Sequence, residues 1–217
     1  MKKYTYIIIG VILVGLVVWW RVASASIVTV DSYSESNQNT DMSLDNYILD
    51  NTALGQSFTN TNSVTLDSVK FYILKNSLPT GNATVSIYAH TGVYGSASLP
   101  TGSALATSDT FDVSTLTTSH QLKTFTFSGV NRIALTSGTY YVVMLNYGGD
   151  GNTSHSVSVG VDSTSPTASG NLIYTTGGIT YAWGVRDTIF YVYGDNGGSA
   201  PTLVAGSGQK MLMSSSF

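Results

Sequence analysis

The side chains of this sequence that are best suited to chemistry are aromatic, amide and carboxylate groups of the kind that hold sugars. Aromatic rings pack against the C–H faces of a sugar, while planar amide and carboxylate groups hydrogen-bond to its hydroxyls. A β-sandwich can present both on a concave face or at a rim of loops. The candidate ligand-binding residues are Trp183, Tyr147, Asp150, Asn152, Tyr88, His90 and Tyr94.

Two of these candidates have a strong structural alternative. Trp183 is the only tryptophan beyond the first 25 residues, and a core or sheet-edge position is favoured for it because large aromatic side chains are buried on average. Tyr88 is equally suited to cross-strand packing on a solvent-facing sheet. Exposure of Trp183 and Tyr147 on one concave surface would favour sugar binding, whereas burial of both would favour a structural role.

Catalysis is not expected from this sequence. The three histidines, His90, His120 and His155, are not within metal-ligand spacing of one another, and no HExxH, GxSxG or P-loop motif occurs. Acid–base hydrolysis of a glycosidic bond uses two carboxylates, but the single glutamate, Glu35, lies in a polar segment near the N-terminus. A catalytic pair would have to come from Asp67, Asp109, Asp112, Asp150, Asp162 and Asp187, several of which read as turn or strand-edge residues.

No cofactor is expected, and the metal question is left open. Oxygen ligands of the kind that calcium takes occur in Asp150-Gly151-Asn152 and in Asp195-Asn196. A complete loop pattern such as the EF-hand is absent, and Asp and Asn in glycine-rich turns commonly serve the turn itself. A structural calcium ion is therefore the weaker of the two interpretations.

Residues 1–25 have the layout of an export signal. Lys2 and Lys3 precede an apolar stretch from Tyr6 to Trp20, and Ala23 and Ala25 stand where a signal peptidase reads small residues. The alternative is an uncleaved N-terminal membrane anchor formed by a hydrophobic helix. Either interpretation predicts that the remaining chain is extracellular or on the cell surface. Without the three basic residues of this segment, six basic residues face twelve acidic ones, so the exported part has a net charge of −6.

The exported part is expected to be all-β, a jelly-roll-like antiparallel β-sandwich over residues 46–194. Short apolar runs alternate with polar residues at period two and are separated by Gly, Pro, Asn and Asp. Residues 26–45 are polar and are interpreted as a loose lead-in, and residues 195–217, rich in Gly, Ser and Ala, as a flexible tail. Inward positions are predicted in four segments, at Val69, Phe71 and Ile73; Ala83, Val85, Ile87 and Ala89; Phe125 and Phe127; and Val157, Val159 and Val161.

Several short runs resemble the choice-of-anchor R type of extracellular β-sandwich domain, over roughly residues 50–194. These runs include Leu54-Gly55-Gln56-Ser57-Phe58, Thr65 to Phe71, Gly81 to Tyr88, Leu105 to Ser108 and Leu135 to Val143. The resemblance implies a jelly-roll module on an exported prokaryotic or phage protein, and it implies no catalytic residues. Such domains are attached by varied sorting signals, and this chain shows no recognisable C-terminal one, which leaves residues 1–25 as the expected anchor.

Composition excludes other classes of function. The chain of 217 residues contains no cysteine, which excludes a disulfide-stapled fold, a thiolate zinc site and a cysteine catalyst. Its six lysines and three arginines are spread too thinly for a nucleic-acid-binding patch. We therefore expect a non-catalytic surface protein that binds carbohydrate or another surface polymer. The alternative is a structural or adhesive cell-surface or virion module without a small ligand, and the sequence predicts no oligomeric state.

Overall fold

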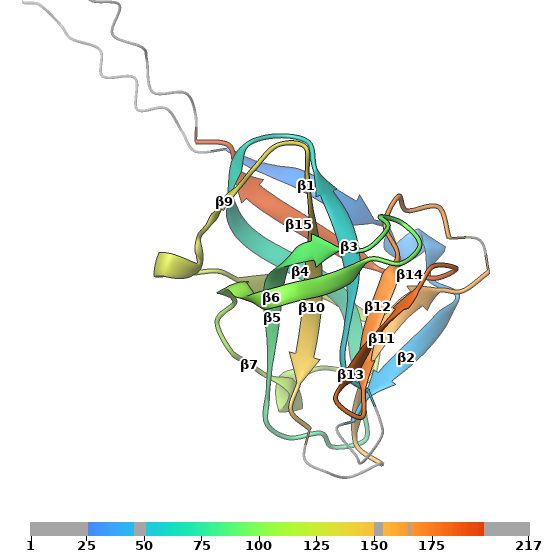
Figure 1. Cartoon of the computed structure of the whole chain (residues 1–217). Helices are drawn as coiled ribbons and strands as arrows, with labels where there is room; N and C mark the ends of the chain where they lie inside the picture. The colour runs from blue at the N-terminus through green and yellow to red at the C-terminus, as the bar shows by residue number, and fades with distance from the viewer. Residues whose placement is uncertain (1–25, 46–50, 150–153, 165, 198–217) are drawn as a thin grey trace, which may run out of the picture.

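The computed structural model describes residues 26–45, 51–149, 154–164 and 166–197, and these residues form two antiparallel sheets packed as a β-sandwich (Figure 1). The first sheet contains β1 (Ile27–Tyr33), β2 (Thr40–Leu44), β4 (Val64–Asn76), β8 (Gln121–Thr126), β9 (Ala134–Leu135), β11 (Ser156–Asp162), β14 (Asp187–Thr188) and β15 (Phe190–Asp195). The second contains β3 (Asn51–Asn60), β5 (Asn82–Thr91), β6 (Leu99–Thr107), β7 (Phe111–Asp112), β10 (Thr139–Tyr147), β12 (Leu172–Thr176) and β13 (Ile179–Trp183). The connections between strands include three 3-10 turns, η1 (Glu35–Asn37), η2 (Val113–Thr115) and η3 (Gly129–Asn131).

The two sheets enclose one main hydrophobic core, as the period-two alternation predicted. Val69, Phe71 and Ile73 of β4 have no exposed surface, and Val85 and Ile87 of β5 face them from the other sheet. Phe125 and Phe127 are also buried, whereas Ala89 is only partly so. The all-β sandwich is therefore confirmed, while the jelly-roll designation stays a prediction.

The second sheet also buries side chains on its outer face. Val142 and Met144 of β10 pack there with Ala53 and Ile173, while Val143 and Leu145, the alternate residues of β10, enter the main core. This arrangement agrees with the sequence of β10, which is apolar on both faces. In consequence β10 is the rigid centre of its sheet, between β3 and β5.

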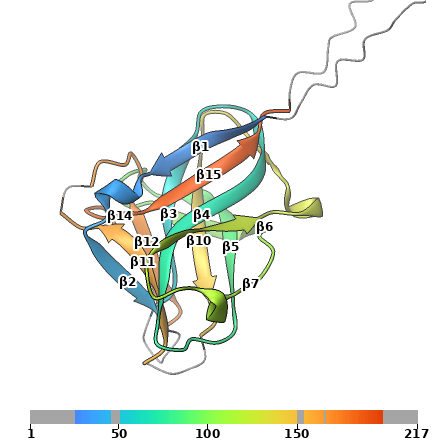
Figure 2. The same cartoon turned by 180° about the vertical axis from the view of Figure 1, so that it is seen from behind.

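Residues 27–44, expected to be a loose lead-in, belong to the sandwich. β1 pairs with β15, and β2 pairs with β11 (Figure 2). Tyr33 and Leu44 are the buried residues that dock these two strands on the core. The expectation was wrong because these strands are held mainly by backbone hydrogen bonds, which leave little trace in a polar sequence.

The segments predicted to direct export and to form a tail lie largely outside the described residues. Residues 1–25, with the predicted signal or anchor, and residues 198–217 are not described. β15 continues to Asp195, one residue beyond the expected end of the domain. Among the residues that are described, no helix has the length and apolar character needed to cross a bilayer.

Candidate functional site

The candidate site is built on the β12–β13 hairpin at one edge of the second sheet. Thr176 pairs with Ile179, so Gly177 and Gly178 form a two-residue turn, with φ of 54° and 78°. Positive φ at both central residues is the requirement of a type I′ turn, which glycine meets without strain. This turn fixes the register of the hairpin and places Tyr174 directly opposite Tyr181.

Three aromatic rings line up across this hairpin, and we call Tyr174, Tyr181 and Trp183 the aromatic row. The rings of Tyr174 and Tyr181 stack with centroids 5.4 Å apart and an interplanar angle of 22°. The ring of Trp183 lies 5.7 Å from that of Tyr174, tilted by 50°. The three rings thus pack against one another as one aromatic cluster, in which the stacked faces of Tyr174 and Tyr181 partly cover each other.

The aromatic row continues the core face of the sheet into solvent. Leu172, which pairs with Trp183, is fully buried in the main core, and Trp183 and Tyr174 are partly buried against it. Nearer the turn, Tyr181 is 41% exposed and Ile179 is 58% exposed. Exposure therefore increases along the row, so the core anchors one end while the other is open to a ligand.

Arg186 extends the row at its buried end. Its Cζ lies 3.7 Å above the centroid of the Trp183 ring. The backbone around it is fixed, because its N–H donates to the carbonyl of Trp183 at 3.3 Å and its carbonyl accepts from the N–H of Leu172 at 2.9 Å. The guanidinium is thus positioned over one face of the indole in a cation–π contact.

A buried carboxyl group beneath this segment ties it to both sheets. Asp187 accepts hydrogen bonds from Gln56 Nε2 at 2.6 Å and from the N–H of Ala168 at 2.9 Å. Burial raises the pKa of Asp187 to about 6, although the two hydrogen bonds lower it and the charge of Asp162 adds to the increase. Asp187 therefore holds the loop that carries Arg186 in place and titrates near neutral pH.

Two of the predicted site residues, His90 and Tyr94, lie together on the opposite, outer face of the same sheet, where Tyr88 packs, partly buried, against the cluster around Val142. Tyr94 stacks on Tyr140 with centroids 4.1 Å apart, and the ring of His90 meets the edges of both. His90 Nε2 lies 3.0 Å from Ser98 Oγ, and burial lowers the pKa of His90. The contacts of His90 with Tyr94 and Ser98 therefore hold the loop after β5 against the end of that strand.

The hydroxyl of Tyr94 is buried beneath that group. It lies near the side chain of Thr59 but makes no hydrogen bond of ordinary geometry. Desolvation raises the pKa of Tyr94 to about 12. Since the stacked partner covers the ring and the hydroxyl is enclosed, Tyr94 offers little surface to a ligand.

Tyr147, predicted to share a binding surface with Trp183, does not join it. Tyr147 is 1% exposed, and its hydroxyl donates to the carbonyl of Thr80 at 2.9 Å. This differs from the expectation of a ligand-facing ring, because β10 continues through Tyr147 and turns the ring into the core. Asp150 and Asn152 lie outside the described residues.

Sequence reasoning identified Trp183 but missed its neighbours Tyr174, Tyr181 and Arg186. The signal that could have found the two tyrosines is the Gly-Gly pair between two β-rich runs, which predicts a two-residue turn and hence the pairing of residues 174 and 181. No comparable signal marks Arg186, because its position over the indole depends on the turn that follows β13.

Another aromatic group lies on β15, where the rings of Tyr191 and Tyr193 are parallel with centroids 6.2 Å apart. The hydroxyl of Tyr191 donates to Glu35, and Lys70 lies over the ring of Tyr193. Both rings are only partly exposed. Because Glu35 and Lys70 contact these two tyrosines, their rings are less open to a ligand than the ring of Tyr181.

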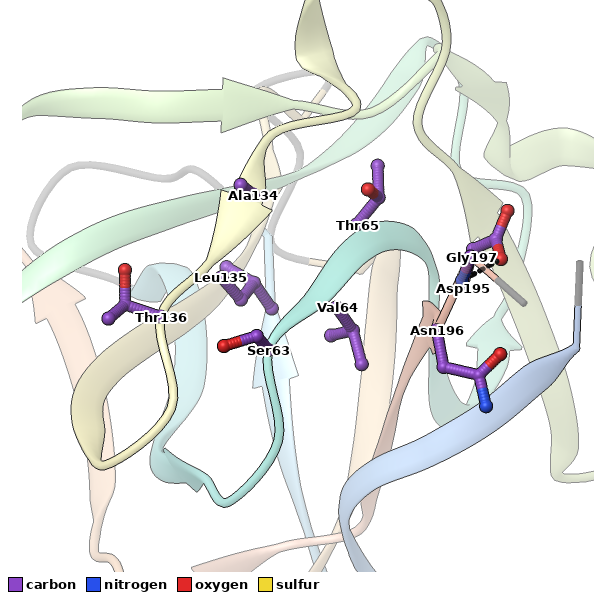
Figure 3. A pocket seen from close by; sticks show the side chains of 9 residues that line it. All are labelled: Ser63, Val64, Thr65, Ala134, Leu135, Thr136, Asp195, Asn196 and Gly197. Carbon is purple, nitrogen blue, oxygen red and sulfur yellow. Dashed lines mark hydrogen bonds between the residues drawn. The ribbon is translucent and has the colours of Figure 1, made fainter. Parts of the chain in front are cut away.

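A shallow pocket of about 280 Å³ lies at the end of the sandwich where β15 finishes (Figure 3). Val64 and Leu135, which pair across β4 and β9, form its apolar floor, and Asp195 and Asn196 stand at its rim. Asp195 is occupied by Arg132 Nη2 at 3.2 Å and by the N–H of Gly197 at 2.8 Å. A neighbouring guanidinium competes with a calcium ion for this carboxylate.

Stacking and charge recognition are the chemistry that the hairpin site can perform. Within residues 26–45, 51–149, 154–164 and 166–197, no group of three or more His, Asp or Glu residues is placed to hold a metal ion. The aromatic row supplies apolar ring surface, chiefly on the exposed Tyr181, the tyrosine hydroxyls supply hydrogen bonds, and Arg186 supplies positive charge. These are properties of a binding surface.

No family model and no curated protein matches the sequence, so the choice-of-anchor R resemblance stays a prediction. A solved structure of the cysteine protease and lectin-like domains of Cwp84, a surface layer associated protein of Clostridium difficile, is similar with a TM-score of 0.40 and 15% sequence identity. The similarity covers 76% of this chain and 37% of that chain. A likeness this distant carries no conclusion about ligand, location or activity.

Proposed function

We propose that this chain is an exported, non-catalytic surface protein whose β-sandwich binds carbohydrate through the aromatic row. The export signal or anchor predicted in residues 1–25 supports the surface location. The stacked and partly exposed pair Tyr174–Tyr181 beside Trp183 is the observation that carries the proposal.

The physical basis of the proposal is the match between this surface and the apolar faces of sugar rings. The ring surface that the stack leaves exposed, chiefly on Tyr181, can pack against C–H groups, and a favourable aromatic contact exceeds area burial alone by about 0.5–1.5 kcal/mol. The rings are held by the hairpin before any ligand arrives, so little conformational entropy is lost on binding. A polymer suits an open row better than a small sugar does, because it can contact several rings together.

The test is the retardation of the purified full chain in native gels that contain soluble polysaccharides. Tyr181→Ala should weaken the binding roughly five- to tenfold. Tyr140→Ala is the matched control, since Tyr140 is 44% exposed on the other face of the same sheet. Loss of binding in Tyr140→Ala but not in Tyr181→Ala would move the site to the face of His90 and Tyr94. Binding to none of the polysaccharides would contradict the proposal and favour the structural alternative.

A further inference from the structure

The charge at the end of the aromatic row indicates which class of sugar the row would take. Arg186 stacks on Trp183 through the flat face of its guanidinium, with Cζ 3.7 Å from the ring centroid. A stacked guanidinium keeps its N–H donors at its edge, where they point away from the ring. The N–H donors of Arg186 therefore lie beside the aromatic rings and do not point at the Trp183 ring.

No carboxylate among the described residues forms an ion pair with Arg186. The ion pairs found in that part of the chain join His120 to Asp41, and Arg132 to both Asp67 and Asp195. The carboxylate nearest in sequence, Asp187, turns inward to Gln56 and to the N–H of Ala168. Among the described residues, the contact given for the Arg186 guanidinium is thus the Trp183 indole, and no carboxylate neutralises its charge.

We propose that the ligand of the aromatic row is an acidic polysaccharide whose carboxylate groups bind Arg186 while its sugar rings stack on Tyr174 and Tyr181. This inference rests on the proposed function and adds the class of sugar to it. The planar fork of a guanidinium fits a carboxylate with two parallel N–H···O bonds, and such charge-assisted pairs are about twice as strong as neutral hydrogen bonds. An unpaired arginine beside an aromatic surface thus selects a uronate-type sugar over a neutral one.

The other cation–aromatic contacts in the described structure do not have this arrangement. Lys123 Nζ lies 3.7 Å from the centroid of the Phe111 ring, and Lys70 Nζ lies 5.0 Å from that of Tyr193. Phe111 packs edge-on against the core residue Phe125. Lys123 therefore has the same charge and the same kind of contact without the exposed row, which makes it a matched control.

The experiment compares the binding of the full chain to polygalacturonate and to the same polymer with its carboxyl groups methyl-esterified, at low ionic strength. The wild-type chain should prefer the acidic polymer roughly tenfold. Arg186→Gln should reduce that ratio to about one while it retains affinity for the esterified polymer. Lys123→Gln, which changes the net charge equally, should keep the wild-type ratio.

Four results would overturn the inference. Equal binding of both polymers by the wild-type chain would do so while leaving the proposed function intact. A preference that survives in Arg186→Gln, or that is lost equally in Lys123→Gln, would show that Arg186 is not the group that selects the carboxylate. Binding to neither polymer would also contradict it, and neutral polysaccharides tested in parallel would then show whether the proposed function fails as well.

Discussion

Asp162 and Asp187 lie directly opposite each other on β11 and β14, and both side chains are buried. Their hydrogen bonds go in different directions. Asp162 accepts from the hydroxyl of Tyr33 at 2.7 Å, whereas Asp187 accepts from Gln56 and from the backbone of Ala168. Burial raises the pKa of Asp187, and the neighbouring charge of Asp162 adds to the increase, so Asp187 keeps its proton to a higher pH than an ordinary aspartate.

The first prediction concerns the pH dependence of stability. Because the pKa of Asp187 is about 6 in the folded chain and 3.8 ordinarily, the folded state binds more protons than the unfolded state between these values. The contribution of Asp187 to the free energy of unfolding is therefore largest below about pH 4 and falls, by about 2 kcal/mol, as the pH rises through 6. Burial also raises the pKa of Asp31, so Asp31 contributes to the pH dependence with the same sign. Urea unfolding between pH 4 and pH 7.5 measures the effect.

The second prediction isolates Asp187 from the other acids. Asp187→Asn removes the titration, so the decrease in unfolding free energy between pH 4 and pH 7 should become smaller by about 2 kcal/mol. At pH 4 the variant should be less stable than wild type, because an amide nitrogen cannot accept the hydrogen bond that the hydroxyl oxygen of the protonated carboxyl still accepts. An unchanged pH profile in this variant would show that another group causes the dependence.

The third prediction concerns the segment that the sequence did not reveal as part of the fold. Tyr33→Phe deletes the hydroxyl that donates to Asp162 and accepts from the N–H of Thr167, and it should lower the free energy of unfolding by about 1–3 kcal/mol. Tyr181→Phe is the control, since the ring of Tyr181 is largely open to solvent, and its effect should stay within about 0.5 kcal/mol. If residues 26–45 were a loose lead-in, the two variants would be equally stable.

The fourth prediction tests the close approach of β3 to β10. A Cβ atom at Gly55 would lie 1.8 Å from the carbonyl oxygen of Val143, a contact that only a backbone shift can relieve. Gly55→Ala should therefore cost about 3 kcal/mol or more, by urea unfolding. At Gly148 an added Cβ would meet no atom within 4 Å, so Gly148→Ala is the control and should change stability little.

The alternation of side chains was enough to predict the sandwich but not its edges. Val69, Phe71 and Ile73 occupy every second position because they line a continuous core, and burial of one face of a strand requires apolar residues at alternate positions. β1 and β2 bury few side chains, so their place in the sheet depends on pairing that a polar sequence does not record. Core strands can be predicted from the sequence because they bury alternate apolar side chains, whereas edge strands bury few side chains and leave no such pattern.

The candidate site was harder to predict, because it depends on which strands become neighbours. Tyr147 ends β10 and precedes several glycines, which suggests a loop, yet its ring is buried in the core and its hydroxyl donates to the carbonyl of Thr80. Trp183 was identified by its residue type, whereas its partnership with Tyr174 required the register of the hairpin. Arg186 required the turn after β13 as well.

The most direct test of carbohydrate binding at the aromatic row is an NMR titration of the full chain with a polysaccharide that it binds, observed at the indole N–H of Trp183. Trp183→Phe assigns this signal among those of the three tryptophans. The account predicts that the Trp183 signal shifts in proportion to the bound fraction, and that Tyr181→Ala requires a roughly five- to tenfold higher polysaccharide concentration for the same shift. A bound polysaccharide that leaves the Trp183 signal unmoved while the ring signals of His90 shift would contradict the account.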